Sequence, residues 1–266
     1  MTKIYEALEQ AGKEREEVKK GVTPQEQHEA DVKTQISAKT SEARSQVKKD
    51  FKTSIKTDSK MEEIMIGLYQ NIASQFTDIK GRSIEFISAR EGEGTSILLR
   101  EFAKAVALKV GKKVLLLDAD PKQYNQSQYF IDRPLDYGWS VEKDEDDDAV
   151  KYLYQYEDTP LFISQISLET TFASILDSPK FDENMKKLKE KFDLVLFDSP
   201  AVNMSPDGLA LSRKVDGVIL VIESEKTRWQ VAADAKNRIL EHGGKILGAV
   251  INNQKHYIPQ FIYDKL

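Results

Sequence analysis

Short apolar runs alternate along the chain with longer stretches whose apolar residues recur at helical spacing. The runs are residues 84–87, 114–117, 161–163, 194–197, 218–222 and 246–251. Continuous runs of this length suit parallel strands that are covered on both faces. Amphipathic helices are predicted at 62–76, 98–110, 178–191 and 227–241. This alternation predicts an α/β fold, a doubly wound and mostly parallel sheet with right-handed crossovers.

Residues 84–120 form the most informative unit, in which a glycine-rich turn separates a strand from a helix. The turn runs from Ala89 to Ser96. A P-loop needs glycines whose backbone N–H groups wrap around phosphates, a lysine that reaches the β and γ phosphates, and a hydroxyl for magnesium. Gly92, Gly94 and Ser96 meet these needs, but Thr95 stands at the lysine position and cannot offset phosphate charge. The turn therefore predicts either an altered phosphate loop or a ligand-free turn between strand and helix.

Carboxylates end two further predicted strands. Asp118 and Asp120 follow the run at 114–117, and Asp198 follows the run at 194–197. An apolar strand that ends in aspartate beside a glycine-rich loop is how P-loop proteins supply a carboxylate near magnesium. Together with the turn at 89–96, these aspartates favour a P-loop NTPase-like fold.

Composition narrows the function classes. The chain has 266 residues, of which 40% are hydrophobic, and it has no cysteine, which excludes disulfides and thiolate metal sites. No apolar run approaches the roughly 20 residues that cross a bilayer, so a cytoplasmic protein is expected. A net charge of −5 argues against nucleic acid as the main partner.

The chain is expected to have three parts. Residues 1–20 predict a short charged helix whose apolar stripe needs a partner or the main domain to cover it. Residues 21–60 are rich in Lys, Glu, Gln, Ser and Thr and predict a disordered, flexible linker. Residues 61–266 are expected to form the folded P-loop domain.

Several motifs occur in an order that resembles the bacterial tyrosine kinases (BY-kinases) of capsule and exopolysaccharide synthesis. They are the turn at 88–96, VLLLDAD at 114–120, FDLVLFDSPAV at 192–202 followed by Asp207, VDGVILVIESEKTR at 215–228 and LGAVINN at 247–253. The likeness extends from about residue 62 to residue 252.

The resemblance implies a fold related to the partitioning ATPases and a bound Mg-ATP or Mg-ADP. The implied cofactor-binding residues are Arg90, Gly92, Glu93, Gly94, Thr95, Ser96 and Asn252, the last of which meets the adenine. The residues implied to hold magnesium are Ser96, Asp118 and Asp198. The implied catalytic residues, which act on magnesium and on the attacking tyrosine hydroxyl, are Asp118, Asp120 and Asp198.

The resemblance also implies partners. In the family, the cytoplasmic segment of a membrane polysaccharide co-polymerase activates the kinase and recruits it to the inner face of the plasma membrane. Phosphorylation of a C-terminal tyrosine cluster between subunits then controls a homo-oligomeric ring. Nucleic acid is not an expected partner.

The sequence departs from the family pattern at three functional places. Thr95 replaces the P-loop lysine, and the ring-forming helix keeps Glu63 but has apolar or aromatic residues at its two arginine positions, 66 and 69. The C-terminus holds only Tyr257 and Tyr263 instead of a tyrosine run. We therefore expect a regulatory or scaffolding pseudokinase of exopolysaccharide synthesis with weak or absent nucleotide binding.

Two alternatives stay open. One is an active tyrosine autokinase in which Arg90 or another basic residue replaces the missing lysine, since an arginine can pair a phosphate bidentately. The other is a DNA-partitioning ATPase, which suits the fold but lacks a basic surface signal.

Overall fold

The computed structural model describes residues 59–120, 125–131, 153–166 and 176–254. The predicted N-terminal helix, the predicted linker up to residue 58 and both C-terminal tyrosines lie outside the described residues. The first described helix, α3 (Ser59–Ala73), begins close to the predicted domain start. None of the helices in the described ranges is long and apolar enough to span a membrane.

A seven-stranded sheet forms the centre of the described domain, in the order β3-β4-β2-β5-β1-β6-β7. Its strands are β1 (Arg82–Ser88), β2 (Val114–Asp118), β3 (Tyr154–Gln155), β4 (Leu161–Gln165), β5 (Leu194–Asp198), β6 (Gly217–Glu223) and β7 (Ile246–Asn252). All neighbouring pairs are parallel except β3 with β4. The predicted doubly wound α/β fold is confirmed, because every predicted apolar run lies in one of these strands.

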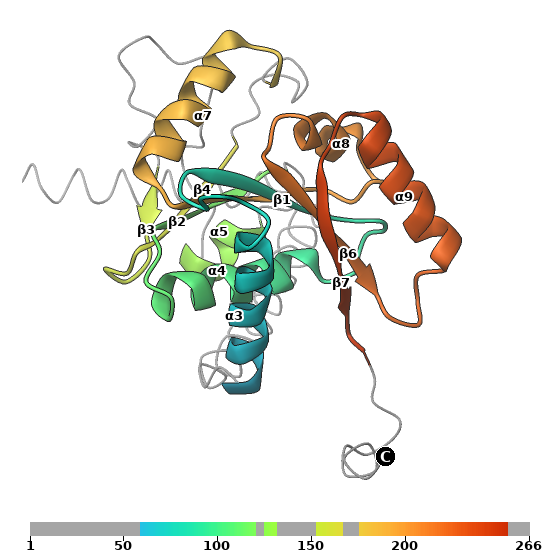
Figure 1. Cartoon of the computed structure of the whole chain (residues 1–266), viewed down its shortest axis with the longest axis horizontal. Coiled ribbons are helices and arrows are strands. Elements are labelled where there is room, and N and C mark those ends of the chain that lie inside the picture. Colours follow the sequence, from blue (N-terminus) through green and yellow to red (C-terminus); the bar gives the residue numbers. More distant parts are fainter. Residues whose placement is uncertain (1–58, 121–124, 132–152, 167–175, 255–266) are drawn as a thin grey trace, which may run out of the picture. The chain divides into compact units, whose positions relative to one another are not determined.

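Helices cover both faces of the sheet (Figure 1). One face carries α3, α4 (Thr95–Leu108) and α5 (Asn125–Ile131), and the other carries α7 (Pro179–Lys191), α8 (Pro206–Ser212) and α9 (Trp229–Glu241). Strand residues alternate between the two layers, as the pleat requires. Phe86 of β1 packs on Phe102 of α4, with ring centroids 5.3 Å apart, whereas the next residue, Ile87, joins the cluster under α8 and α9.

Helix α3 packs against α4 through its buried residues Met65, Tyr69 and Ile72. Its Glu62 also pairs with Lys109 at the end of α4, at 3.0 Å. One of the two positions at which the family resemblance implies a ring-forming arginine is therefore a core aromatic residue in this chain.

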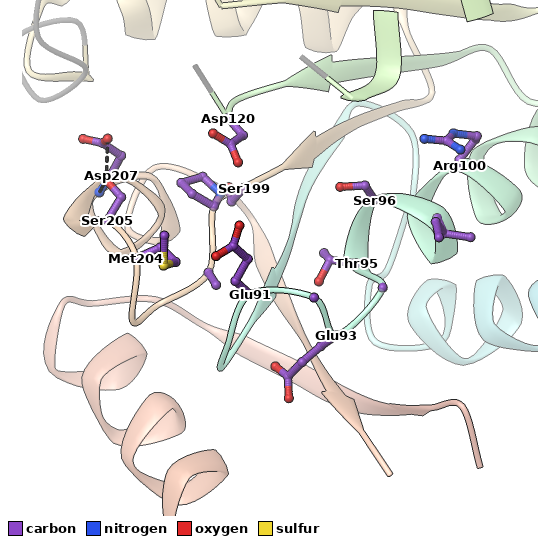
Figure 2. Close-up of a pocket in the computed structure, with 15 residues that line it drawn as sticks. Glu91, Glu93, Thr95, Ser96, Arg100, Asp120, Ser199, Met204, Ser205 and Asp207 are labelled. Atoms are coloured by element: carbon purple, nitrogen blue, oxygen red, sulfur yellow. Dashed lines mark hydrogen bonds between the residues drawn. The ribbon is translucent and has the colours of Figure 1, made fainter. Parts of the chain in front are cut away.

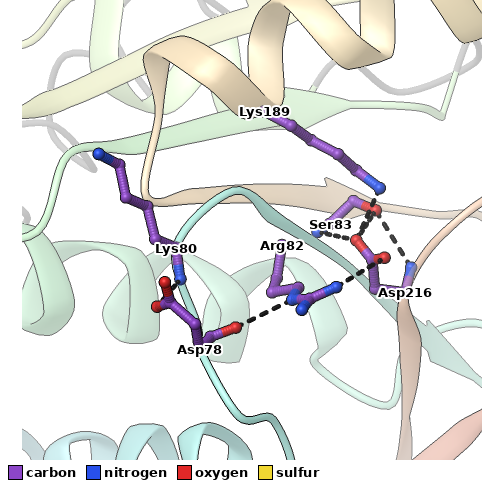
Figure 3. Close-up of polar contacts among 6 residues, drawn as sticks. All are labelled: Asp78, Lys80, Arg82, Ser83, Lys189 and Asp216. Carbon is purple, nitrogen blue, oxygen red and sulfur yellow. Dashed lines mark hydrogen bonds and ion pairs between the residues drawn. The ribbon is translucent and has the colours of Figure 1, made fainter.

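An ionic cluster joins β1, α7 and β6 at the amino ends of the strands (Figure 3). The Asp216 carboxylate accepts hydrogen bonds from the Ser83 backbone N–H and hydroxyl, both at 2.8 Å, and pairs with Lys189 at 2.7 Å. Arg82 lies 3.6 Å from its other oxygen. Burial opposes the charged form, yet Lys189 and the Ser83 donors hold the pKa of Asp216 below its ordinary value. The cluster thus fixes the end of the sheet opposite the strand ends that carry the P-loop and the aspartates.

Replacing Asp216 by asparagine is expected to lower the free energy of unfolding by about 1–2 kcal/mol at pH 7, since charge-assisted hydrogen bonds are lost. Because the folded carboxyl has a depressed pKa, this stability is present above pH ~4 and is lost as the pH falls further. Urea unfolding of wild type and variant at pH 7 and at about pH 2.5 should show the difference shrink at the lower pH. Asp177→Asn, which removes an exposed pair with Arg213, is the control and should change little. Equal destabilisation by both substitutions would contradict this account.

Candidate functional site

The predicted site residues come from the carboxyl ends of three adjacent strands. The parallel register pairs Asp118 of β2 with Asp198 of β5, and Asp198 in turn with Phe86 of β1. The glycine-rich turn follows β1 directly and leads into α4. In open α/β sheets, ligands bind outside the carboxyl ends of the strands, where the strand order reverses. The sheet therefore brings the predicted loop and the predicted aspartates to one place.

The Glu93 side chain anchors the glycine-rich turn from behind. Its carboxylate accepts a hydrogen bond from the Arg90 N–H at 2.7 Å, another from the Glu223 N–H at 3.2 Å and a third from the Thr227 hydroxyl. Glu93 is 2% exposed, and its carboxylate oxygens are directed at these three donors and not at the cavity. The loop is thereby tied to the end of β6 before any ligand arrives.

Asn252 fixes the same loop from β7. Its side-chain N–H donates to the Glu93 carbonyl oxygen at 2.8 Å. A Cβ atom on Gly94 would lie 2.3 Å from that amide nitrogen, and Gly92 and Gly94 both have a φ of +83°. Successive amides in such left-handed turns form a concave anion-binding nest. The residue for which the resemblance implies adenine contact is therefore held against the P-loop backbone.

A cavity of about 300 Å³ opens in front of the loop (Figure 2). Its walls come from the P-loop and α4, from the end of β2 and from the segment between β5 and α8, and they consist of residues 91–97, Arg100, Asp120, 199–201, Met204, Ser205 and Asp207. Of the predicted residues, those from Gly92 to Ser96 and Asp120 line the cavity. Arg90 is exposed and is not part of this lining, and neither are Asp118, Asp198 and Asn252.

Two hydroxyls in the cavity wall lack hydrogen-bond partners among the described residues. They are Thr95 Oγ1 and Ser199 Oγ, whose residues are 7% and 5% exposed. Leaving a buried hydroxyl unpaired costs about 1–3 kcal/mol. The Ser199 hydroxyl faces the buried Glu85 carboxyl, so Thr95 Oγ1 is the hydroxyl of this pair that an acceptor oxygen of a ligand can satisfy.

Gln126 of α5 covers the two aspartates at the strand ends. Its backbone N–H donates to Asp118 at 2.9 Å, and its side-chain amide donates to Asp198 at 2.7 Å and to the Ser96 carbonyl oxygen at 2.8 Å. Burial raises the pKa of both carboxyls, and the charge of Asp198 raises that of Asp118 further. Hydrogen bonds from Gln126 and from the Ser96 hydroxyl act in the opposite direction on Asp198.

Arg100 is the basic side chain in this cavity wall. It lies on α4 beyond Ser96, on the side of the helix that faces β2 and α5 (Figure 2). Its Nε donates to the Gln126 side-chain oxygen at 3.2 Å, and its guanidinium lies 3.7 Å from the Tyr129 ring centroid. Burial lowers the pKa of Arg100, whereas Tyr129, Asp198 and Asp118 raise it.

The implied magnesium ion fits this arrangement only in part. Ser96 lines the cavity, and its hydroxyl is bonded to Asp198, as a magnesium-binding P-loop requires. The Asp118 and Asp198 carboxylates do not line the cavity. Gln126 donates a hydrogen bond to one oxygen of each. Within the residues that the structure describes, no three acidic or histidine side chains are placed to hold a metal ion. As they stand, these residues do not form an open magnesium site.

Arg100 and Gln126 are among the site residues that the sequence reasoning missed. Arg100 gave a usable signal, because it is a charged residue among the apolar positions Leu98 and Phe102 of the predicted helix. Gln126 gave none, because it lies in a polar stretch without periodicity.

The fold and the loop define a P-loop protein of the ATPase type, and comparisons with known proteins identify the family. Residues 82–247 match the family model described as cellulose biosynthesis protein BcsQ. The chain is 30% identical over 187 residues to the tyrosine-protein kinase YwqD of Bacillus subtilis, spanning 70% of this chain and 78% of that protein. It is 28% identical over 200 residues to the putative tyrosine-protein kinase CapB of Staphylococcus aureus, spanning 74% of this chain and 86% of CapB. The chain belongs to the bacterial tyrosine-protein kinase family, and it also matches the BcsQ family model.

Solved structures show the same fold. The kinase domain of the Escherichia coli tyrosine kinase ETK superposes with a TM-score of 0.64 at 16% identity, covering 73% of this chain and 76% of that one. The chimerical protein CapA2B2 gives 0.62 at 23% identity, covering 73% and 85%. The cell division ATPase MinD of Pyrococcus furiosus gives 0.54 at 22% identity, covering 70% and 79%. The predicted relation to BY-kinases and to the partitioning ATPases is therefore confirmed at the level of fold.

Proposed function

We propose that this chain is a regulatory or scaffolding subunit of exopolysaccharide synthesis, a pseudokinase whose nucleotide binding is weak or absent. The observation that carries the proposal is Thr95, a short neutral side chain at the bottom of the P-loop where the family has a lysine. Transfer of a phosphoryl group depends on positioning and charge stabilisation, and loss of one well-placed cation lowers the rate on the order of 100-fold or more. The exposed Arg90 lies outside the cavity lining and does not replace that cation.

The proposed partner is the cytoplasmic segment of a membrane polysaccharide co-polymerase. Support comes from the relatives, which are tyrosine-protein kinases, and from the family model, whose description names cellulose biosynthesis. In this proposal the domain at 61–266 stays in the cytoplasm and is held at the inner face of the plasma membrane through the partner. The segments 1–20 and 21–60 act as docking helix and tether.

The second candidate function is an active tyrosine autokinase. Arg100 favours it, because a buried guanidinium in the cavity wall is an alternative cation for the phosphates. The roles assigned to Asp118, Asp120 and Asp198 apply to this candidate.

Incubation of the purified chain with Mg-ATP tests the two functions, with phosphotyrosine as the readout. We expect no phosphotyrosine on the wild-type chain, and an ATP affinity at least about tenfold higher in Thr95→Lys, because the lysine restores a charge at the phosphates. A co-precipitation with the co-polymerase segment should succeed with both proteins. Phosphotyrosine on the wild type that disappears in Asp118→Asn would refute the pseudokinase and favour the kinase.

A further inference from the structure

One polar cluster lies directly beneath the cavity. It consists of the Asp118 and Asp198 carboxylates, the Gln126 amide and the Arg100 guanidinium, joined by the hydrogen bonds described above. All four residues are buried, and Arg100 is the member that also lines the cavity. The cluster therefore connects the predicted metal ligands to the predicted phosphate site.

Gln126 uses the carboxylate oxygens that a cation would need. Its backbone N–H donates to Asp118 and its side-chain amide donates to Asp198, while the Asp120 N–H approaches the other Asp118 oxygen at 3.2 Å. Magnesium binds through oxygen lone pairs at about 2.1 Å in near-octahedral geometry. An amide donor and a metal ion cannot use the same lone pair of a carboxylate oxygen, so a metal ion at Asp118 Oδ2 or Asp198 Oδ2 would compete with Gln126.

Arg100 supplies positive charge where the metal ion would otherwise supply it. Its guanidinium lies within electrostatic range of both aspartates and is held by Gln126 and the Tyr129 ring. A guanidinium binds phosphate oxygens through directional N–H donors and is weakly hydrated, which suits a residue that is only 7% exposed, as Arg100 is. The chain thus carries a permanent cation in the cavity wall.

We infer that this chain binds a phosphate-bearing ligand at the P-loop without a divalent cation. Arg100 supplies the positive charge, and the hydrogen bonds from Gln126 keep Asp118 and Asp198 from binding a metal ion. The inference deepens the proposed function and rests on the P-loop keeping a ligand, however weakly. The Thr95 hydroxyl, which has no hydrogen-bond partner among the described residues, is a neutral donor for the ligand's oxygens. Carboxylates at 91, 120 and 207 also line the cavity and oppose each added negative charge, so a nucleoside diphosphate is favoured over a triphosphate.

Calorimetric titration of the full chain with ADP, once in EDTA and once in excess Mg²⁺, tests this inference. The wild-type affinity should agree within about threefold between the two buffers, which corresponds to less than 1 kcal/mol. Arg100→Gln should weaken ADP binding by about tenfold or more in both buffers, because a charged partner of the phosphates is lost. Lys109→Gln removes the same charge from the far end of α4 and should leave the affinity unchanged.

Gln126→Ala provides a second variant, because it removes the side-chain amide from Asp198 while the backbone N–H at 126 still donates to Asp118. It also removes the oxygen that accepts from Arg100, so it is compared with Arg100→Gln. Magnesium should strengthen ADP binding to Gln126→Ala by about fivefold or more. Arg100→Lys keeps a charge at the site and should bind ADP between wild type and Arg100→Gln, provided that thermal melting shows each variant folded.

Two outcomes would overturn the inference. One is wild-type ADP binding that magnesium strengthens tenfold or more. The other is no ADP binding in either buffer, a result that leaves the scaffolding function standing because partner binding is measured separately. Conversely, loss of partner binding with metal-independent ADP binding intact would refute the scaffold and keep this inference.

Discussion

The Glu85→Gln variant is expected to be more stable than the wild type above about pH 6 and to lose most of the pH dependence of stability between pH 5 and pH 8. Glu85 lies on the central strand β1 and is fully buried between Phe197 and Val218 of the neighbouring strands. Burial raises its pKa to about 8, and the nearby Ser199 hydroxyl acts in the opposite direction. Among the described residues, neither carboxyl oxygen has a hydrogen-bond partner of good geometry.

The direction of the effect follows from proton binding. Between the unfolded pKa near 4.5 and the folded value of about 8, the folded state holds a proton that the unfolded state releases. Raising the pH therefore favours unfolding by up to about 1.4 kcal/mol per pH unit. Glutamine resembles the protonated acid in shape and does not titrate.

Urea unfolding of wild type and Glu85→Gln at pH 5, 6, 7 and 8 would measure this difference. Glu241→Gln, which changes an exposed acid at the end of α9, is the matched control and should follow the wild-type curve. If the Glu85→Gln and wild-type curves ran parallel across this range, the buried carboxyl would have to be ionised in the folded protein.

Gly94→Ala is the second change with a large expected effect, a loss of about 2–4 kcal/mol of stability together with a distorted P-loop. An alanine at a φ of +83° costs about 1–2 kcal/mol in backbone strain. Its Cβ would also collide with the Asn252 amide, which would lose the hydrogen bond to the Glu93 carbonyl.

Gly92→Ala separates these two contributions. Gly92 has the same φ, but nothing lies within 4 Å of the Cβ that alanine would add. It should therefore lose only the strain energy, about 1–2 kcal/mol in urea unfolding. In Gly94→Ala, adding Asn252→Ala should recover part of the loss by removing the collision. Equal destabilisation by the two single alanines would show that Asn252 moves aside without cost.

The sheet was predictable because its strands are buried on both faces. Continuous apolar runs such as the one at 114–117 are typical of buried parallel strands. All six predicted runs are strands in the structure. β3 was missed because its residues Tyr154 and Gln155 are exposed and pair with only one strand. The seven-residue helices α5 and α8 were missed because they are too short for periodicity to show.

The site was less predictable than the fold, since its decisive contacts join distant parts of the chain. The motif placed Gly92, Gly94 and Ser96 correctly at the turn before α4, because that geometry is local. Which side chain covers Asp118 and Asp198 depends on how α5 returns over the sheet, and no local pattern encodes that return. Likewise, the three donors to Glu93 lie up to 134 residues away.

The anchoring of the P-loop by Glu93 and Asn252 has a consequence for the thermodynamics of binding. Fixing the backbone of one residue costs about 1–2 kcal/mol of conformational entropy. In this loop the entropy is already lost when the chain folds, before a ligand binds. A ligand that enters the cavity meets a pre-organised loop and keeps the free energy of its contacts as affinity. Exchange at position 95 therefore alters the chemistry offered to the ligand while the architecture persists.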